Sequence, residues 1–282
     1  MNVLYDCVSL GRRTLRRVLP DRGVATLKAM WTDYSFRRFK PRMVRHRYGA
    51  YDFQIEIVDF DGQAWYDTDL PELASEIDLF KRSRLRPGAK IINAGANQCI
   101  QAMMLAKEVE PDGFCWAVEP NHHNVCAGRR NAKLNGIQNM EVIEAAVSSA
   151  PGTVLFNSSM NGRVTQDVNE SGAHSVPAIT IDGLAAEKGS PQLLYIDVEG
   201  FECEVLKGAR ETLHSSKPDC YVEVHLQMGL ERFGGSAEKV LSFFPRNQYD
   251  LFFNCGDGAA YQRLGVSSDL PKKRFCLAVL SR

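Results

Sequence analysis

The stretch KIINAGANQCIQAMMLAKE, residues 90–108, decides how the rest of the sequence is interpreted. Lys90 to Ala94 have the character of a buried strand, and an amphipathic helix follows with almost no loop between. Gly95 at the turn lets the chain bend sharply and lets another group approach the backbone where a Cβ would collide. We therefore predict a strand, a tight turn and a helix, with Asn97 both capping the helix and facing a ligand.

From this point strand patterns alternate with helical patterns. Strands are predicted at 90–94, 114–119, 140–147, 153–156, 176–181, 193–199, 220–226, 249–255 and 275–281, and helices at 97–108, 121–135, 201–214 and 236–244. This alternation is typical of an α/β fold whose mostly parallel sheet is covered by helices on both faces. The Gly-, Ser- and Asn-rich residues 157–175 are predicted to form a mobile loop above the sheet.

The part before this repeat is less regular. Residues 53–66 are predicted to form two short strands around Asp61-Gly62, which is a hairpin signal. Residues 71–85 begin with Pro71 and carry apolar residues at helical spacing, so a helix is predicted there. We divide the chain into a basic extension with its hairpin, residues 1–70, and a main α/β domain, residues 71–282.

Charge is unevenly distributed, although Lys and Arg together number 34 and so do Asp and Glu. Residues 1–47 hold twelve basic residues against three aspartates, a balance of +9, so the remaining chain carries −9. Apolar residues between the arginines of residues 1–19 fit a basic amphipathic helix. Such a helix can lie on an anionic membrane surface or dock on the domain with its arginines in water. Nucleic acid is a less favoured partner, because the segment has no known recognition fold.

Composition predicts a cytoplasmic protein, peripheral at the inner membrane face if the basic segment binds lipid. The chain is 44% hydrophobic and 24% charged, as in ordinary soluble domains. It has neither a signal-peptide pattern nor an apolar run of the roughly 20 residues that a spanning helix needs. Its eight cysteines show no CxxC pair, which favours reduced thiols.

Acidic residues stand at three predicted strand ends. Glu119 ends the second strand, where an acid can accept hydrogen bonds from both hydroxyls of an adenosine ribose, or can simply face water. Asp197 and Glu199 end a later strand, and two such acids need a cation, a shared proton or water. Tyr221, Glu223 and His225 share one strand face, and a carboxylate beside an imidazole suits proton abstraction or metal binding. The G-x-G-x-x-G fingerprint is absent, which disfavours a nicotinamide dehydrogenase.

The motifs NAGANQC, WAVEPNHHN, NAKLNG, VSSAPGTVLF, YIDVEGFECEVLKGA and KPDCYVEVH, in this order and spacing, resemble the FkbM-type family of S-adenosylmethionine-dependent methyltransferases. The resemblance covers roughly residues 88–227. It implies a Rossmann-like, seven-stranded methyltransferase sheet with an antiparallel last strand. It also implies methyl transfer to an oxygen, often a hydroxyl of a sugar, glycolipid or secondary metabolite, so that the partner is a small-molecule or glycan acceptor.

The resemblance also assigns roles to residues. Those that would bind S-adenosylmethionine are Asn93, Gly95, Ala96 and Asn97 at its methionine part, Glu119 with Pro120 at the ribose, and Asp197 beside the methyl group. His225 is the first candidate for the base that deprotonates the acceptor, with Glu223 orienting it, and Asp197 is the alternative. Mg²⁺ held by Asp197, Glu199, Glu223 or His225 is chemically reasonable, but no residue spacing demands a metal site.

Two positions depart from the family pattern. Asn93 replaces an aspartate, which removes a negative charge beside a cationic cofactor. Cys99 replaces a glycine where the cofactor is expected to approach. A catalytically silent protein that binds the cofactor or adenosine, or that acts as a membrane-surface scaffold, therefore stays open as an alternative.

Overall fold

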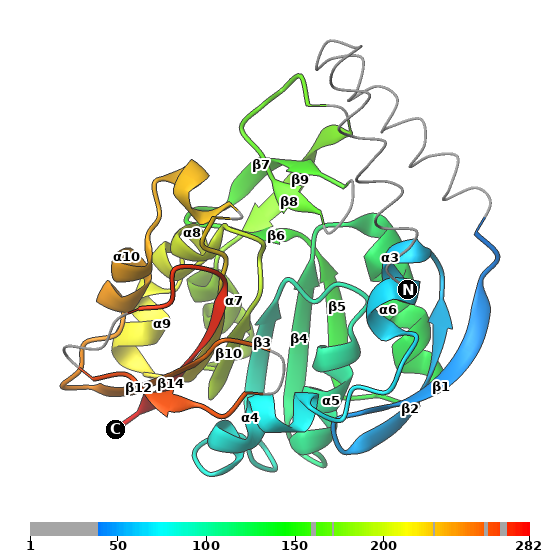
Figure 1. The fold of residues 1–282 in the computed structure, drawn as a ribbon, viewed down its shortest axis with the longest axis horizontal. Helices are drawn as coiled ribbons and strands as arrows, with labels where there is room; N and C mark the ends of the chain where they lie inside the picture. Colours follow the sequence, from blue (N-terminus) through cyan, green and yellow to red (C-terminus); the bar gives the residue numbers. More distant parts are fainter. Residues whose placement is uncertain (1–38, 159–161, 171, 228, 257–258, 266–269) are drawn as a thin grey trace.

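The central sheet has eight strands in the order β13-β12-β14-β11-β10-β3-β4-β5 (Figure 1). The computed structural model describes residues 39–282, except 159–161, 171, 228, 257–258 and 266–269. The helix expected at residues 1–19 lies outside the described residues. The strands of this sheet are β3 (Lys90–Ala94), β4 (Phe114–Glu119), β5 (Met140–Glu144), β10 (Leu193–Ile196), β11 (Asp219–Val224), β12 (Tyr249–Asn254), β13 (Gln262–Arg263) and β14 (Phe275–Ser281).

The direction of these strands confirms the predicted fold class. β3, β4, β5, β10 and β11 run parallel to one another, while β14 is antiparallel to both β11 and β12. The last strand is therefore the antiparallel one, inserted between two strands that run the other way. The two-residue β13 adds an edge strand to the seven that were expected.

Helices cover both faces of the sheet (Figure 1). One face carries α4 (Leu73–Lys81), α5 (Ile100–Glu108) and α6 (His122–Leu134), and the other carries α7 (Ile181–Lys188), α8 (Glu202–Lys207), α9 (Arg210–Ser215) and α10 (Ala237–Ser242). Successive residues of β3 belong to different cores: Ile91 packs with the first helices and Ile92 with the second. This alternation is the period-two geometry of a strand buried on both sides.

The helix predicted at 201–214 is divided into α8 and α9. Asp182 explains the break, because its carboxylate accepts hydrogen bonds from the backbone amides of Glu211 (3.1 Å) and Thr212 (2.8 Å). These amides belong to the first turn of α9, which is thereby capped from outside and begins afresh. A short 3₁₀ helix, η1 (Leu230–Phe233), follows β11.

A second sheet occupies the region predicted to be a loop. It has the order β6 (Ala146–Val147), β9 (Ala173–Ile179), β7 (Gly152–Asn157) and β8 (Arg163–Val164). The predicted strand at 140–147 is therefore two strands in two sheets, and residues 157–175 are not one loop, because they contain β8 and the start of β9. Phe156 anchors this sheet in a small core with Ala146 and Val176.

The N-terminal hairpin also differs from the prediction. Its strands are β1 (Arg42–Tyr48) and β2 (Tyr51–Ile57), and residues 60–66 form helix α3 (Phe60–Tyr66). The hairpin predicted around Asp61-Gly62 is wrong because Asp59 caps a helix there, its carboxylate accepting from the amide of Gly62 at 2.5 Å. The true hairpin turns at Gly49, which has φ +57°.

The hairpin is held to the main domain through α6. The side-chain oxygens of Asn135 and Asn131 accept hydrogen bonds from the backbone amides of Gln54 and Glu56, both at 2.9 Å. These bonds use amides on an otherwise open strand edge. Among the helices of the described residues, none combines the length and the apolar character needed to cross a bilayer.

The turn after β3 brings two strand ends together. Gly95 has φ +85°, and a Cβ on it would overlap the carbonyl group of Asp197, whose carbon would be 2.7 Å away. The amides of Gly95 and Ala96 both donate to the carbonyl of Val118, at 2.9 and 3.1 Å. The expectation that a ligand needs the bare backbone of Gly95 is therefore corrected: the group that lies against it is the chain's own Asp197 carbonyl.

This contact predicts that Gly95→Ala lowers the free energy of unfolding by about 3 kcal/mol, from left-handed strain plus steric overlap. Gly88→Ala is the matched control, because Gly88 also has φ +85° but nothing within 4 Å of its added Cβ. We expect it to cost only about 1 kcal/mol. Urea unfolding of both variants measures the difference, and equal losses would show that the Asp197 contact is unimportant.

Candidate active site

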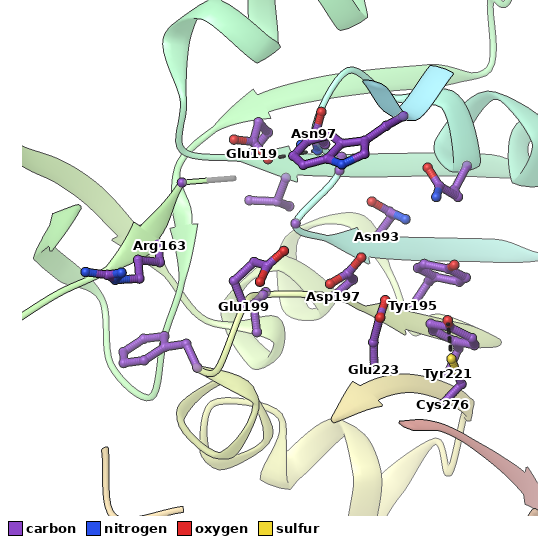
Figure 2. A pocket seen from close by; sticks show the side chains of 18 of the residues that line it. Asn93, Asn97, Glu119, Arg163, Tyr195, Asp197, Glu199, Tyr221, Glu223 and Cys276 are labelled. Atoms are coloured by element: carbon purple, nitrogen blue, oxygen red, sulfur yellow. Dashed lines mark hydrogen bonds between the residues drawn. The ribbon is translucent and has the colours of Figure 1, made fainter. Parts of the chain in front are cut away.

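A pocket of about 430 Å³ lies at the carboxyl ends of β3, β4, β10 and β11 (Figure 2). Parallel α/β sheets bind their ligands at this edge. The structure brings nearly all predicted site residues to this pocket. Those that line it are Asn93, Gly95, Ala96, Asn97, Glu119, Pro120, Asp197, Glu199 and Glu223. His225 does not line it.

Glu119 lies at the junction of two turns. Its carboxylate accepts hydrogen bonds from the backbone amides of Asn97 at 2.8 Å and Asn121 at 2.9 Å. Burial raises the pKa of Glu119 to about 7, although these two amides act in the opposite direction. Each carboxylate oxygen keeps further acceptor capacity, so the group can receive hydroxyl donors from a ligand in the pocket.

Asn97 has a different local role from the predicted one. Helix α5 begins at Ile100 with Cys99 as its N-cap residue, and no side chain caps it. The side-chain oxygen of Asn97 instead accepts from the amide of Gln98 at 2.7 Å, which stabilises the turn. The capping prediction for Asn97 is therefore wrong, but its position on the pocket wall agrees with a ligand contact.

Asn93 and Cys99, the two departures from the family pattern, differ in their surroundings. Asn93 is 1% exposed, and its Oδ1 has no hydrogen-bond partner among the described residues. Cys99 is fully buried and does not line the pocket. It packs against Gly128 of α6, where a Cβ would clash with its sulfur. The expectation that Cys99 crowds the cofactor is corrected, because Gly128 makes the room for its side chain.

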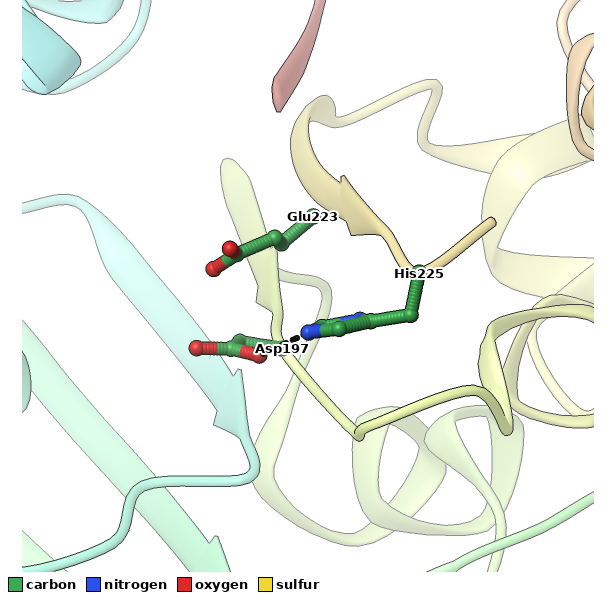
Figure 3. Close-up of side chains that lie close together, drawn as sticks. All are labelled: Asp197, Glu223 and His225. Atoms are coloured by element: carbon green, nitrogen blue, oxygen red, sulfur yellow. Dashed lines mark ion pairs between the residues drawn. The ribbon is translucent and has the colours of Figure 1, made fainter. Parts of the chain in front are cut away.

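His225 is buried behind the pocket, with only 1% of its surface exposed. Its Nδ1 lies 2.7 Å from Oε1 of Glu202, and its Nε2 lies 3.5 Å from Glu199 Oε2. The same Nε2 lies 3.7 Å from Asp197 Oδ1 (Figure 3). Burial alone would lower the pKa of His225, but the hydrogen bond to Glu202 and the charges of Asp197 and Glu199 raise it to about 10. His225 also lies behind the pocket wall rather than on it, which argues against His225 as the base that contacts an acceptor.

The prediction that Glu223 orients the His225 imidazole is wrong. It makes an ion pair with Arg274, whose Nη1 lies 2.6 Å from Glu223 Oε1. The residue that orients His225 is Glu202, which is completely buried. Glu202 stands three residues after Glu199, inside the motif quoted above, so its presence but not its contact was visible in the sequence.

Asp197 lies between the pocket and the buried His225–Glu202 pair. Burial and the negative charge of Glu223 raise its pKa well above its usual range, while His225 opposes the shift. An acid with such neighbours either keeps a proton or requires a cation. Asp197 thus faces both the ligand space and His225, as Figures 2 and 3 show.

One wall of the pocket is aromatic and acidic, and most of it was not predicted from the sequence. Tyr195 and Tyr221 are stacked, with ring centroids 4.1 Å apart, and the Tyr195 hydroxyl donates to Glu76 at 3.1 Å. Burial raises the pKa of Glu76 to about 7. Strand periodicity already placed Tyr221 on one face with Glu223, and the same periodicity could have identified Tyr195, two residues before Asp197. Glu76 comes from α4 and had no such signal.

The profile of the FkbM methyltransferase domain matches residues 93–251, more than half of the chain. The chain belongs to this family. The matched residues run from within β3 into β12 and include all four strand ends that form the pocket. This places the chain among the S-adenosylmethionine-dependent methyltransferases.

Solved structures with a similar arrangement are distant in sequence. An FkbM methyltransferase from Methylobacillus flagellatus is 17% identical with a TM-score of 0.46, and the match covers 68% of this chain but only 43% of that one. A precorrin-6y C5,15-methyltransferase from Geobacter metallireducens is 13% identical, with a TM-score of 0.45 and 76% and 88% of the two chains covered. An rRNA methylase from Streptococcus thermophilus is 11% identical, with a TM-score of 0.46 and 75% and 96% covered. No curated protein matches the chain.

The His225–Glu202 pair predicts an effect on stability. His225→Ala should lower the free energy of unfolding by about 3–5 kcal/mol, because it leaves the buried Glu202 carboxylate without its counter-charge. Adding Glu202→Gln should recover part of this loss, since the orphaned charge is removed. Urea unfolding of the two single variants and the double variant at pH 7 gives the coupling energy. Strictly additive losses would contradict the pairing.

Proposed function

We propose that this methyltransferase transfers a methyl group to a hydroxyl oxygen of a sugar, glycolipid or other polyhydroxylated metabolite. The observation that carries the proposal is that one pocket is lined both by the residues expected to bind the cofactor and by a group of carboxylates. The carboxylates are Glu76, Asp197, Glu199 and Glu223. Carboxylates accept hydrogen bonds from hydroxyl groups, so they suit an acceptor that carries several of them.

The residues at the other end of the pocket fit S-adenosylmethionine. Glu119 offers a buried carboxylate for the ribose hydroxyls, and Pro120 lies beside it on the pocket wall. Asn93 offers an amide oxygen that lacks a donor, with Ala96 and Asn97 nearby on the same turn. When bound, the cofactor supplies the sulfonium methyl group that is transferred.

The chain's own residues would orient the acceptor and receive its proton. Because Asp197 lines the pocket and His225 does not, we assign proton acceptance to Asp197, the alternative named from the sequence. Asp197 lines the pocket next to the Gly95 turn, so its carboxylate can reach a hydroxyl held between the two strand ends. The stacked Tyr195 and Tyr221 rings offer an apolar surface to the sugar, and closing such a site around its substrate excludes water.

The alternative of a catalytically silent cofactor-binding protein was based on Asn93 and Cys99, and the structure removes the second of these grounds. Cys99 is accommodated by Gly128 outside the pocket, so it gives no ground for weak cofactor binding. Asn93 keeps a hydrogen-bond acceptor although it lacks the charge of an aspartate. Binding of the cofactor without any methyl transfer would still favour the alternative.

Cofactor binding is tested by calorimetric titration with S-adenosylmethionine. We expect Glu119→Ala to weaken binding roughly 100-fold, because two hydrogen bonds to a charged group are lost. Glu144→Ala is the matched control, since Glu144 pairs with Glu119 in register on β5 but does not line the pocket. Thermal unfolding checks that both variants fold. Unchanged affinity in folded Glu119→Ala would contradict the assignment.

The acceptor class is tested by transfer of labelled methyl groups to a panel of sugars and glycolipids. A methyl ether is expected, which survives base treatment that hydrolyses methyl esters. Label found only on nitrogen, on carboxyl groups or on RNA would refute O-methylation of a hydroxyl.

The basic segment supports a further part of the proposal, a peripheral contact with anionic membrane at the cytoplasmic face. Eight of the twelve basic residues in 1–47 lie in residues 1–38. Within β1, Arg42 is already paired with Asp67, so the fold itself uses part of this charge. The lipid contact is therefore assigned to residues 1–38.

Liposome co-sedimentation should separate the full chain from a chain that starts at residue 39, which keeps β1. We expect the full chain to bind vesicles containing anionic lipid, less at high salt, and the shortened chain to stay in solution. Vesicles of neutral lipid are the control. Equal sedimentation of the two chains would remove the proposal without affecting the methyltransferase assignment.

A further inference from the structure

Five ionisable side chains are gathered under the pocket, which we call the carboxylate–imidazole cluster: Asp197, Glu199, Glu202, Glu223 and His225. Four of them are acids, and His225 is the only base within the cluster. Arg274, the residue before β14, forms an ion pair with Glu223. If all four acids are ionised and His225 is protonated, the cluster and Arg274 together carry a net charge of −2.

The spacing between Asp197, Glu223 and His225 fits metal coordination. One ligand atom from each of Asp197, Glu223 and His225 lies within 4.8 Å of the other two (Figure 3). The His225 Nε2 to Asp197 Oδ1 distance of 3.7 Å exceeds the normal hydrogen-bond range. Two atoms that share an ion at about 2.1 Å lie roughly 3 to 4 Å apart, so a small side-chain adjustment would close the cluster around one.

The orientation of the His225 ring also fits metal binding. Its Nδ1 faces the buried Glu202 carboxylate at 2.7 Å, which leaves Nε2 directed at Asp197 and Glu199. Imidazoles that bind metals almost always have their other ring nitrogen held by a carboxylate or carbonyl in this manner. A metal ion would take the place of the proton on Nε2.

A second observation on the pocket indicates a missing donor or cation. Asn93 is 1% exposed, its Oδ1 has no partner among the described residues, and Figure 2 shows the side chain on the side of the pocket that carries Asp197. A metal ion or a water bound to it would supply what this oxygen lacks. The ammonium group of the cofactor is the other candidate, and titration without cofactor separates the two.

We propose that Asp197, Glu223 and His225 bind one divalent ion of the first-row transition series, such as Mn²⁺. Mg²⁺, which was considered from the sequence, fits less well because it prefers an all-oxygen environment, whereas imidazole suits transition metals. The ion would sit at the acceptor end of the pocket and hold a hydroxyl oxygen of the acceptor. This role in orienting the acceptor rests on the proposed function, but the binding of the ion does not.

The test uses the full chain, freed of metal with EDTA and without cofactor. Mn²⁺ is added, and the free ion is measured by electron paramagnetic resonance. We expect one tight site per chain in the wild type. Asp197→Asn and Glu223→Gln should each weaken it by at least about tenfold, since even residues that only support metal ligands have effects of this size.

Glu187→Gln is the control, because Glu187 is a 70% exposed acid on α7, outside the pocket. It should bind Mn²⁺ as the wild type does. Absence of tight binding to the wild type, or equal binding by Asp197→Asn and Glu223→Gln, would overturn the metal site. His225 variants are avoided because they are expected to destabilise the fold.

Calorimetry with S-adenosylmethionine on the same metal-free protein keeps the two proposals apart. Cofactor binding without a Mn²⁺ site would refute the metal proposal alone. A Mn²⁺ site without cofactor binding would support the metal site and refute the proposed function.

Discussion

The contact between Gly95 and the carbonyl of Asp197 is the constraint on which the site depends. It brings the turn after β3 against the end of β10, closer than any side chain would permit. The amides of this turn are bound to Val118, and the next amide, from Asn97, is bound to Glu119. Three strand ends are therefore fixed relative to one another by backbone groups, before any ligand is present.

The second constraint is electrostatic. The pocket has carboxylates at both ends, and burial holds the pKa values of Glu119 and Glu76 near 7 and that of Asp197 well above its usual range. Carboxylates kept in this state cost folding free energy, because burial disfavours their charged form. A positively charged cofactor, a metal ion and the hydroxyls of an acceptor would each relieve this cost. The site is thus prepared for ligands that donate hydrogen bonds or carry positive charge.

Much of the fold was predictable because β3, β4, β10 and β11 are short apolar runs that end in polar residues. These run ends meet at one sheet edge, which is why nine of the ten predicted site residues line one pocket. The prediction failed where tertiary contacts override local signals. Asp61-Gly62 reads as a turn but lies in a helix capped by Asp59, and Asp182 divides the helix predicted at 201–214. Residue roles were harder still, since only the structure shows that Glu202, not Glu223, holds His225.

The central claim is that the cofactor lies across the Gly95 turn, between Glu119 and Asp197. The most direct measurement is a crystal structure of the protein with S-adenosylhomocysteine, the product left after methyl transfer. We predict density with the ribose at Glu119, the methionine part along Asn93 to Asn97, and the sulfur facing Asp197. Density in another part of the molecule, or a ligand whose ribose does not contact Glu119, would contradict the account.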